Sequence, residues 1–175
     1  MAKSSKEQQA EDERKILAEL QKNSKENIDT IAKHCGFLRQ KTWRFIKRLE
    51  ENHLIWGYTA IVDEEKLGLQ KFILSIKRSG KKLDKKSVDE LAVEKLEKNI
   101  SKIGVNVETS YFTHGEFDWV LIFSTKDIIQ AKKFTDLLFS AYPDIVDKVN
   151  LSQILFINRD HNIINPDQTK LKDFL

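Results

Sequence analysis

Residues 27–62, NIDTIAKHCGFLRQKTWRFIKRLEENHLIWGYTAIV, contain the pattern that decides the fold of the N-terminal part of this chain. Asn27 is a favourable N-cap residue and Gly36 is a favourable C-terminal stop, so a short helix is predicted from Ile28 to about Cys35. A second helix is predicted from about Leu38 to Asn52, because its apolar residues recur at helical spacing. Two short helices joined by a glycine turn indicate a helix-turn-helix.

The second of these helices is apolar on one face and basic on the opposite face. Its apolar face holds Thr42, Phe45, Ile46 and Leu49, and its other face holds Gln40, Arg44, Lys47 and Arg48, with Lys41 and Trp43 on the flanks. From Lys33 to Arg48 there are six basic residues and no acidic ones, although the net charge of the whole chain is only +3. A basic helix face is often no more than a solvated surface. The absence of acids, the glycine turn and the two-stranded wing predicted to follow together favour instead a helix that enters the major groove of DNA.

The flanking sequence sets the limits of this first domain. Residues 1–10 are polar and are predicted to form a flexible arm, with a helix beginning near Glu11. Leu54–Trp56 and Tyr58–Val62 are rich in aromatic and β-branched residues and are predicted to be two short strands around Gly57. A winged helix-turn-helix domain is therefore predicted over residues 11–62, followed by a polar linker over residues 63–69.

Residues 70–157 follow a different pattern. Strands are predicted over Phe72–Lys77, Val105–Thr113, Phe117–Phe123 and Lys148–Ile157, and helices over Ser87–Ile103 and from about Asp127 to Ala141. This order is that of a ferredoxin-like βαββαβ domain, in which two helices cover one face of an antiparallel sheet. The predicted fold class is therefore α+β, with a winged helix-turn-helix domain followed by a ferredoxin-like domain.

The second face of that sheet has no cover within one chain. Apolar side chains available to it are Ile73, Val120, Ile122, Ile154 and Phe156. We expect this face to be covered by a second copy in a symmetric homodimer. Residues 158–175 show little periodicity and are predicted to be a C-terminal tail, which Leu171, Phe174 and Leu175 could dock.

Composition narrows the class of function. No apolar run approaches the ~20 residues that span a bilayer, and the N-terminus has no apolar signal-peptide core, so a cytoplasmic protein without membrane contact is expected. The single cysteine, Cys35, has no intrachain disulfide partner, and the 4 histidines lack metal-ligand spacing, so no metal or cofactor is expected. The absence of a nucleotide-binding loop, zinc-protease helix or nucleophile elbow predicts that the protein is not an enzyme.

Three stretches resemble the Lrp/AsnC (feast/famine) transcription regulators. They are DERKILAELQK at 12–22, the run from Asn27 to Leu69, whose most specific part is IKRLEENHLIWGYTAIVD, and YFTHGEFDWVLIF at 111–123. The resemblance covers about residues 11–157. It implies a homodimeric regulator, often assembled into tetramers or octamers, that binds double-stranded DNA and responds to amino acids or similar small molecules.

The resemblance also implies an effector site on the predicted hairpin. Its residues are Thr113, His114, Gly115 and Asp118, where Asp118 would receive an ammonium group and backbone N–H groups would hold a carboxylate. The alternative is that Gly115 only makes the turn and Asp118 only satisfies it. The chain departs from the family pattern at Leu38, where a capping Ser or Thr is usual, and at His53, where glycine is common.

The predicted function is sequence-specific binding of double-stranded DNA. The residues expected to contact DNA are Arg39, Gln40, Lys41, Trp43, Arg44, Lys47, Arg48 and Gly57. Gln40, Lys41, Arg44 and Lys47 are expected to face the major groove, while Arg39, Arg48 and the wing near Gly57 position phosphates; Trp43 either packs or contacts a thymine methyl or sugar. Two-fold symmetry predicts a roughly palindromic operator with half-sites ~10 bp or a multiple of it apart. The alternatives are a haem-pathway decarboxylase of the kind that resembles this family, and an effector-independent architectural DNA-binding protein.

Overall fold

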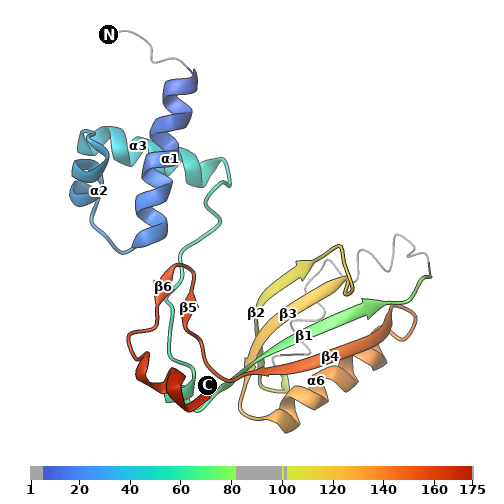
Figure 1. Cartoon of the computed structure of the whole chain (residues 1–175). Coiled ribbons are helices and arrows are strands. Elements are labelled where there is room, and N and C mark those ends of the chain that lie inside the picture. Colours follow the sequence, from blue (N-terminus) through green and yellow to red (C-terminus); the bar gives the residue numbers. More distant parts are fainter. Residues whose placement is uncertain (1–5, 82–99, 101, 175) are drawn as a thin grey trace. The chain divides into compact units, whose positions relative to one another are not determined.

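The computed structural model describes residues 6–81, 100 and 102–174, and the chain divides into two compact units. The first unit comprises Met1–Ile61 with Asn158–Thr169, and the second comprises Val62–Ile157 with Lys170–Leu175. Figure 1 shows the helices of the first unit and the sheet of the second. None of the helices in the described ranges is long and apolar enough to cross a membrane.

The first helix, α1 (Lys6–Lys22), begins before the point that the sequence analysis gave. Residues 6–10, expected to belong to a flexible arm, are helical, because this polar stretch consists largely of strong helix formers. Asp12, Ile16 and Leu20 form a buried stripe at intervals of four residues. That stripe faces the other two helices of the unit.

The next two helices follow the prediction closely. In α2 (Ile28–Cys35), the side chain of Asn27 accepts a hydrogen bond from the Thr30 N–H, and Gly36 adopts a left-handed φ of 70° that ends the helix. The turn leads to α3 (Arg39–Glu51), whose N-cap Leu38 makes no side-chain cap hydrogen bond. Ile16, Leu20, Ile31 and Leu49 form the buried centre of this three-helix unit.

The segment after α3 differs from its prediction in secondary structure. No strand is assigned between His53 and Val62, so the two short strands expected around Gly57 do not form. A hairpin of three- and five-residue strands would have few ladder bonds, and such isolated pairs are marginal in water. Instead the Ile55 N–H donates to the Leu49 carbonyl, and the Tyr58 hydroxyl donates to Glu50 at 2.9 Å. The segment therefore follows α3 as irregular chain.

The second unit contains a four-stranded antiparallel sheet in the order β2-β3-β1-β4. Its elements are β1 (Gln70–Arg78), β2 (Val105–Phe112), β3 (Trp119–Thr125), α6 (Ile128–Ala141) and β4 (Val146–Ile154). Asp127 caps α6 by accepting from the Gln130 N–H, as the sequence predicted. This is the ferredoxin-like strand order, and most of the helix predicted over 87–103 lies outside the described residues.

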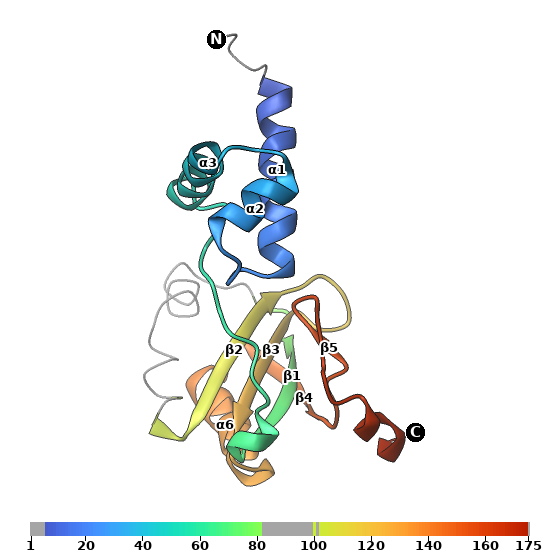
Figure 2. The same ribbon diagram turned by 90° about the vertical axis from the view of Figure 1, so that its left-hand side faces the viewer.

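Helix α6 covers one face of the sheet (Figures 1 and 2). Phe72, Phe123 and Phe134 are fully buried between them, and the Phe123 and Phe134 rings meet edge to face with centroids 4.9 Å apart. The strand period of two sends the alternate residues to the opposite face. There Ile73 lies beside Ile122, and Ser75 lies beside Val120. This opposite face, called here the open face, is only half-buried at these positions.

The C-terminal residues contain more secondary structure than was predicted for the tail. They form a short hairpin of β5 (Arg159–Asp160) and β6 (Ile163–Ile164), followed by a 3-10 helix, η2 (Thr169–Phe174). The hairpin turns through His161 and Asn162, which both have positive φ. In the second unit the Phe174 ring packs 6.1 Å from that of Phe156, which confirms Phe174 as a docking residue. Another 3-10 helix, η1 (Glu65–Leu67), lies within the predicted linker.

Candidate nucleic-acid interface

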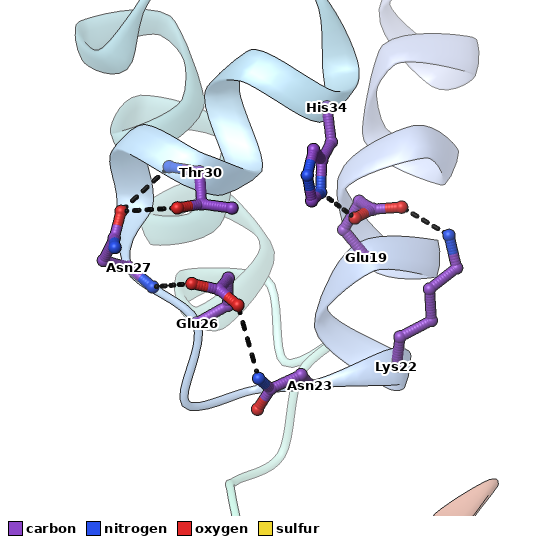
Figure 3. A network of polar contacts seen from close by, with 7 residues as sticks. All are labelled: Glu19, Lys22, Asn23, Glu26, Asn27, Thr30 and His34. Atoms are coloured by element: carbon purple, nitrogen blue, oxygen red, sulfur yellow. Dashed lines mark hydrogen bonds and ion pairs between the residues drawn. The ribbon is translucent and has the colours of Figure 1, made fainter.

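Helix α2 and the turn after it are fixed by local polar contacts. Figure 3 shows Asn27 receiving hydrogen bonds from both the backbone N–H and the hydroxyl of Thr30, at 2.8 and 3.1 Å. It also shows His34 of α2 reaching Glu19 of α1, with Nδ1 and Oε2 2.7 Å apart. Glu19 is paired with Lys22 as well, and these contacts lower the pKa of Glu19. These contacts hold α2 to α1. The turn at Gly36 then places α3 beside both helices.

Four of the predicted DNA contacts lie on the outward face of α3, opposite its buried Thr42 and Leu49. They are Gln40, Trp43, Arg44 and Lys47, all exposed. Trp43 is 51% exposed, and the Lys47 ammonium lies 5.3 Å from the centre of its ring. Trp43 is therefore available for contact from outside rather than committed to the core. These four side chains are called here the outward face of α3.

Lys41 and Arg48 point the other way, toward α1. The Lys41 ammonium lies 2.6 Å from Oδ2 of Asp12 and 4.0 Å from the centre of the Phe37 ring. The Arg48 guanidinium lies 2.6 Å from Oε1 of Glu13. Both cations thus bind groups of their own domain, which does not favour the DNA contacts expected of them.

The remaining predicted contacts are Arg39, at the N-terminus of α3, and Gly57, in the segment that follows α3. Arg39 is paired with Asp29 of α2 at 2.9 Å, but both side chains are largely exposed, so the pair is weak and open to exchange. Lys47 of the outward face has a similar surface pair, 3.7 Å from Glu51. At Gly57 an added Cβ would meet no atom within 4 Å, so the backbone there is open to close approach by another molecule.

The folded domain neutralises much of the charge that the sequence concentrates between Lys33 and Arg48. Asp12, Glu13, Asp29 and Glu51 each pair with one of its cations. Among the described residues no acidic partner is recorded for Lys33 or Arg44. Asp12 and Glu13 were not among the predicted site residues. The signal for Asp12 is that it continues the apolar stripe of Ile16 and Leu20, a position where a carboxylate needs a partner.

The predicted effector residues lie at the hairpin between β2 and β3. The Thr113 hydroxyl donates to the Phe117 carbonyl at 2.8 Å, and His114 and Gly115 are exposed. Oδ2 of Asp118 accepts from the Arg78 N–H at 2.9 Å and lies 3.2 Å from the Lys77 ammonium. These two contacts lower the pKa of Asp118, and the hydrogen bond from the Arg78 backbone has the larger effect. The Asp118 side chain thus ties this end of the β2–β3 hairpin to the end of β1.

Among the described residues no group of three or more His, Cys, Asp and Glu side chains is arranged to hold a metal ion. Burial raises the pKa of the Cys35 thiol, which is partly buried beside the helical core. A raised thiol pKa opposes formation of the reactive thiolate. Cys35 therefore behaves as a small packing residue.

Comparison with known proteins identifies the family. Residues 13–55 match the family model described as winged helix-turn-helix DNA-binding. The HTH-type transcriptional regulator FL11 of Pyrococcus horikoshii is 30% identical over 130 residues, covering 73% of this chain and 78% of that protein. FL11 of Pyrococcus furiosus is 32% identical over 130 residues, which again cover 73% of this chain and 78% of that protein.

Solved structures show the same fold over nearly the whole chain. An AsnC family transcriptional regulator from Agrobacterium tumefaciens has a TM-score of 0.65 at 20% identity, covering 89% of this chain and 96% of that one. The transcriptional regulator NMB0573 of Neisseria meningitidis, solved as an L-Met complex, has a TM-score of 0.65 at 17% identity, with 95% and 99% coverage. With its relatives and its two-unit fold, the chain belongs to the Lrp/AsnC family of HTH-type transcriptional regulators.

Proposed function

We propose that this regulator binds double-stranded DNA with the outward face of α3 lying in the major groove. The observation that carries the proposal is the state of Arg44. It is exposed at the centre of that face, and no acidic partner for it is recorded within the described part of the chain. A guanidinium that is not committed elsewhere can donate two hydrogen bonds to guanine. The adjacent Gln40 amide can donate one hydrogen bond to N7 of adenine and accept one from its N6 amino group.

The other contacts follow from position on the same helix. Arg39 and Lys47 flank the base-reading pair, and their surface ion pairs cost little to exchange for phosphates. Trp43 offers an exposed ring for a thymine methyl or a sugar. The open backbone at Gly57 allows a phosphate to approach closely. Lys41 and Arg48 support α3 from behind in this arrangement.

A homodimer formed through the open face of the sheet is part of the proposal. Ile73, Val120, Ile122 and Ile154 place a band of apolar side chains on that face, across β1, β3 and β4. Two-fold pairing of identical patches is the usual way to cover such a surface. The dimer would present two copies of α3, so a roughly palindromic operator with half-sites a whole number of turns apart is expected. Tetramers or octamers would extend the same symmetry.

The experiment that tests DNA binding is selection of bound duplexes from a random pool, followed by titration of the selected sequence at increasing salt. Because phosphate contacts release counterions, the logarithm of the binding constant should fall linearly with the logarithm of the salt concentration. A flat response between about 50 and 200 mM salt would contradict a phosphate-contacting face.

Arg44→Ala should reduce discrimination between the selected sequence and variants changed at one base pair, by about 1–3 kcal/mol at that position. Arg14→Ala, on the exposed side of α1, removes the same charge elsewhere in the unit and serves as the matched control. If Arg44→Ala weakened binding to all sequences alike, Arg44 would contact phosphate rather than a base.

We further propose that an amino acid or a similar small molecule modulates binding at the β2–β3 hairpin. The structurally similar regulator of N. meningitidis was solved as a complex with L-Met. In this chain the hairpin residues His114 and Gly115 are exposed. Asp118 would brace this turn, and an effector ammonium would have to displace Lys77 from it. A thermal-shift screen of the amino acids, L-methionine included, tests the idea; a ligand at about 100 times its Kd adds about 2.7 kcal/mol to stability.

The alternative functions have distinct signatures. A purified protein that is coloured, binds a tetrapyrrole and shifts no DNA would favour the decarboxylase. Binding with little sequence preference, indifferent to every amino acid, would favour the architectural protein. The proposed regulator should instead enrich a defined sequence from the pool.

A further inference from the structure

Helix α3 carries a second stripe of chemistry on the side that faces α1. Lys41 and Arg48 are seven residues apart, which is two turns, and Phe45 lies between them on the same face. The Phe45 ring centre is 5.6 Å from the Lys41 ammonium and 4.6 Å from the Arg48 guanidinium carbon. The two cations therefore flank one aromatic side chain along the underside of the helix.

Both cations are bound by neighbouring acids of α1. Asp12 is only 2% exposed and accepts from Lys41 at 2.6 Å and from the Gln8 amide at 3.1 Å. The hydrogen bond from Lys41 lowers the pKa of Asp12 against the opposing effect of its burial. Glu13, the next residue, binds Arg48 at 2.6 Å. Adjacent residues of one helix thus hold points two turns apart on the other.

Two such attachments constrain a helix more than the apolar core alone does. Apolar packing is non-directional, so a helix can rotate somewhat about its own axis at a small loss of buried area. A charge-assisted hydrogen bond is directional, and two of them separated by two turns resist that rotation. The rotation of α3 decides where Gln40 and Arg44 point.

We infer that Asp12 and Glu13 are positioning residues that set the rotation of α3 and so aim its outward face at the bases. Lys41 and Arg48 are their partners within the domain. The inference rests on the proposed DNA binding. It assigns base reading to the outward face and helix orientation to the pairs beneath it.

The test exchanges the charges of the more exposed pair, Glu13 and Arg48. In variants shown to be folded by circular dichroism, E13R and R48E should each lower the ratio of specific to non-specific affinity for the selected duplex. The double variant E13R/R48E should restore that ratio, because the opposite pair can form again. The salt slope should stay unchanged in all three. E51Q, which removes the exposed partner of Lys47, is the matched control and should leave the ratio unchanged.

Two results would overturn the inference. If R48E lowers the magnitude of the salt slope by about one and E13R does not restore binding, Arg48 contacts a phosphate. If the single variants leave the specificity ratio unchanged, the pair does not orient the helix. A wild-type protein that enriches no duplex from the pool would instead contradict the proposed function itself.

The buried pair supplies an independent test if the exchange variants do not fold. D12N keeps the size of the side chain but removes its charge, so the fold should survive while the ion pair with Lys41 is lost. D12N and K41M should each lower the specificity ratio, and the double variant should lose no more than the worse single one, since both remove the same contact. Losses that simply add, with a salt slope reduced by about one in K41M alone, would make Lys41 a direct DNA contact.

Discussion

Leu38 and His53 flank α3, and at each position another residue would suit the local structure better. Leu38 is the N-cap of α3 with φ −75° and ψ 145°, yet its side chain makes no cap hydrogen bond and is 80% exposed. His53 has φ 54°, in the left-handed region that favours glycine. The two departures from the family pattern therefore lower the stability of the helical unit, and a single substitution at each position can remove the effect.

Leu38→Ser should raise the free energy of unfolding of the helical unit by about 1 kcal/mol. The hydroxyl would accept one of the N–H groups in the first turn of α3 that have no side-chain cap, and little packing would be lost. Urea unfolding followed by circular dichroism at 222 nm measures the change. Leu38→Ala is the control, because it removes the same side chain without adding an acceptor. Equal stabilities of the two variants would contradict the capping argument.

His53→Gly should also stabilise this unit, by about 1 kcal/mol, because glycine adopts a positive φ without the steric penalty that a Cβ brings. Asn52→Gly, one residue earlier, is the matched control: Asn52 has φ −85°, so glycine there gains nothing and should lower stability slightly. Both are read from the same unfolding curves. A His53→Gly protein no more stable than the wild type would show that His53 contributes a contact that offsets the strain.

At the scale of elements, Lys71 joins three segments of the second unit. It is 7% exposed, and its ammonium lies 2.6 Å from Glu64 before η1 and 2.8 Å from Glu108 on β2. Glu108 stands at the bulge where the pairing of β2 with β3 shifts register. Burial by itself lowers the pKa of Lys71, but the two carboxylates outweigh it and raise the pKa overall. The end of the linker is thus tied to the sheet by a charged cluster.

Lys71→Met should destabilise the second unit by about 3 kcal/mol, since it leaves two carboxylates facing each other without their cation. Lys77→Met is the matched control on the same strand and face. Its ammonium is partly exposed and 3.2 Å from Asp118, so its loss should cost under about 1 kcal/mol. The fluorescence of the buried Trp119, in a background with the other two tryptophans replaced by Phe, reports the unfolding of this unit. Similar losses in the two variants would show that the cluster has no special weight.

At the scale of the whole molecule, the open face of the sheet decides assembly. Ile122 lies on β3 beside Ile73 of β1, in the interior of this face. Ile122→Lys should convert the proposed dimer to a monomer, because an ammonium would be buried at a two-fold contact. Sedimentation equilibrium measures the mass, which for one chain is 20.4 kDa. Ile129→Lys, on an exposed position of α6, should leave the dimer intact. An Ile122→Lys protein that still sediments as a dimer would place the interface elsewhere.

Most of the helices and strands could be read from the sequence because they depend on local signals. Asn27 and Gly36 bound α2, and Asp127 caps α6, through contacts within four residues. The strands of the sheet lie within a few residues of their expected limits for the same reason: alternation is a property of consecutive residues. The prediction of two strands in the wing was wrong, because a strand needs a partner. Residues 54–62 have the composition of strands, but they pair with no other strand in the described chain.

The candidate site shows the same division. Helical periodicity placed Gln40, Arg44 and Lys47 on one face with Trp43 on its flank, and all four side chains are exposed. It also placed Arg48 on that face and Lys41 on its flank. Only the packing of α1 against α3 directs these two side chains toward α1. It brings Asp12 within 2.6 Å of Lys41, although the two residues are 29 apart in the chain.

The sequence by itself showed the resemblance to the family. It also determined most of the elements and the faces of α2 and α3, because caps, turns and periodicity act between near neighbours. The tertiary structure alone decided which charges remain available. Side chains of Asp12, Glu13 and Glu108 reach cations that are far away in the chain, and Coulomb attraction depends on distance in space. The six cations from Lys33 to Arg48 are therefore free of acids only in the sequence, not on the surface of the folded unit. In the folded unit they are divided between the support of α3 and its outward face.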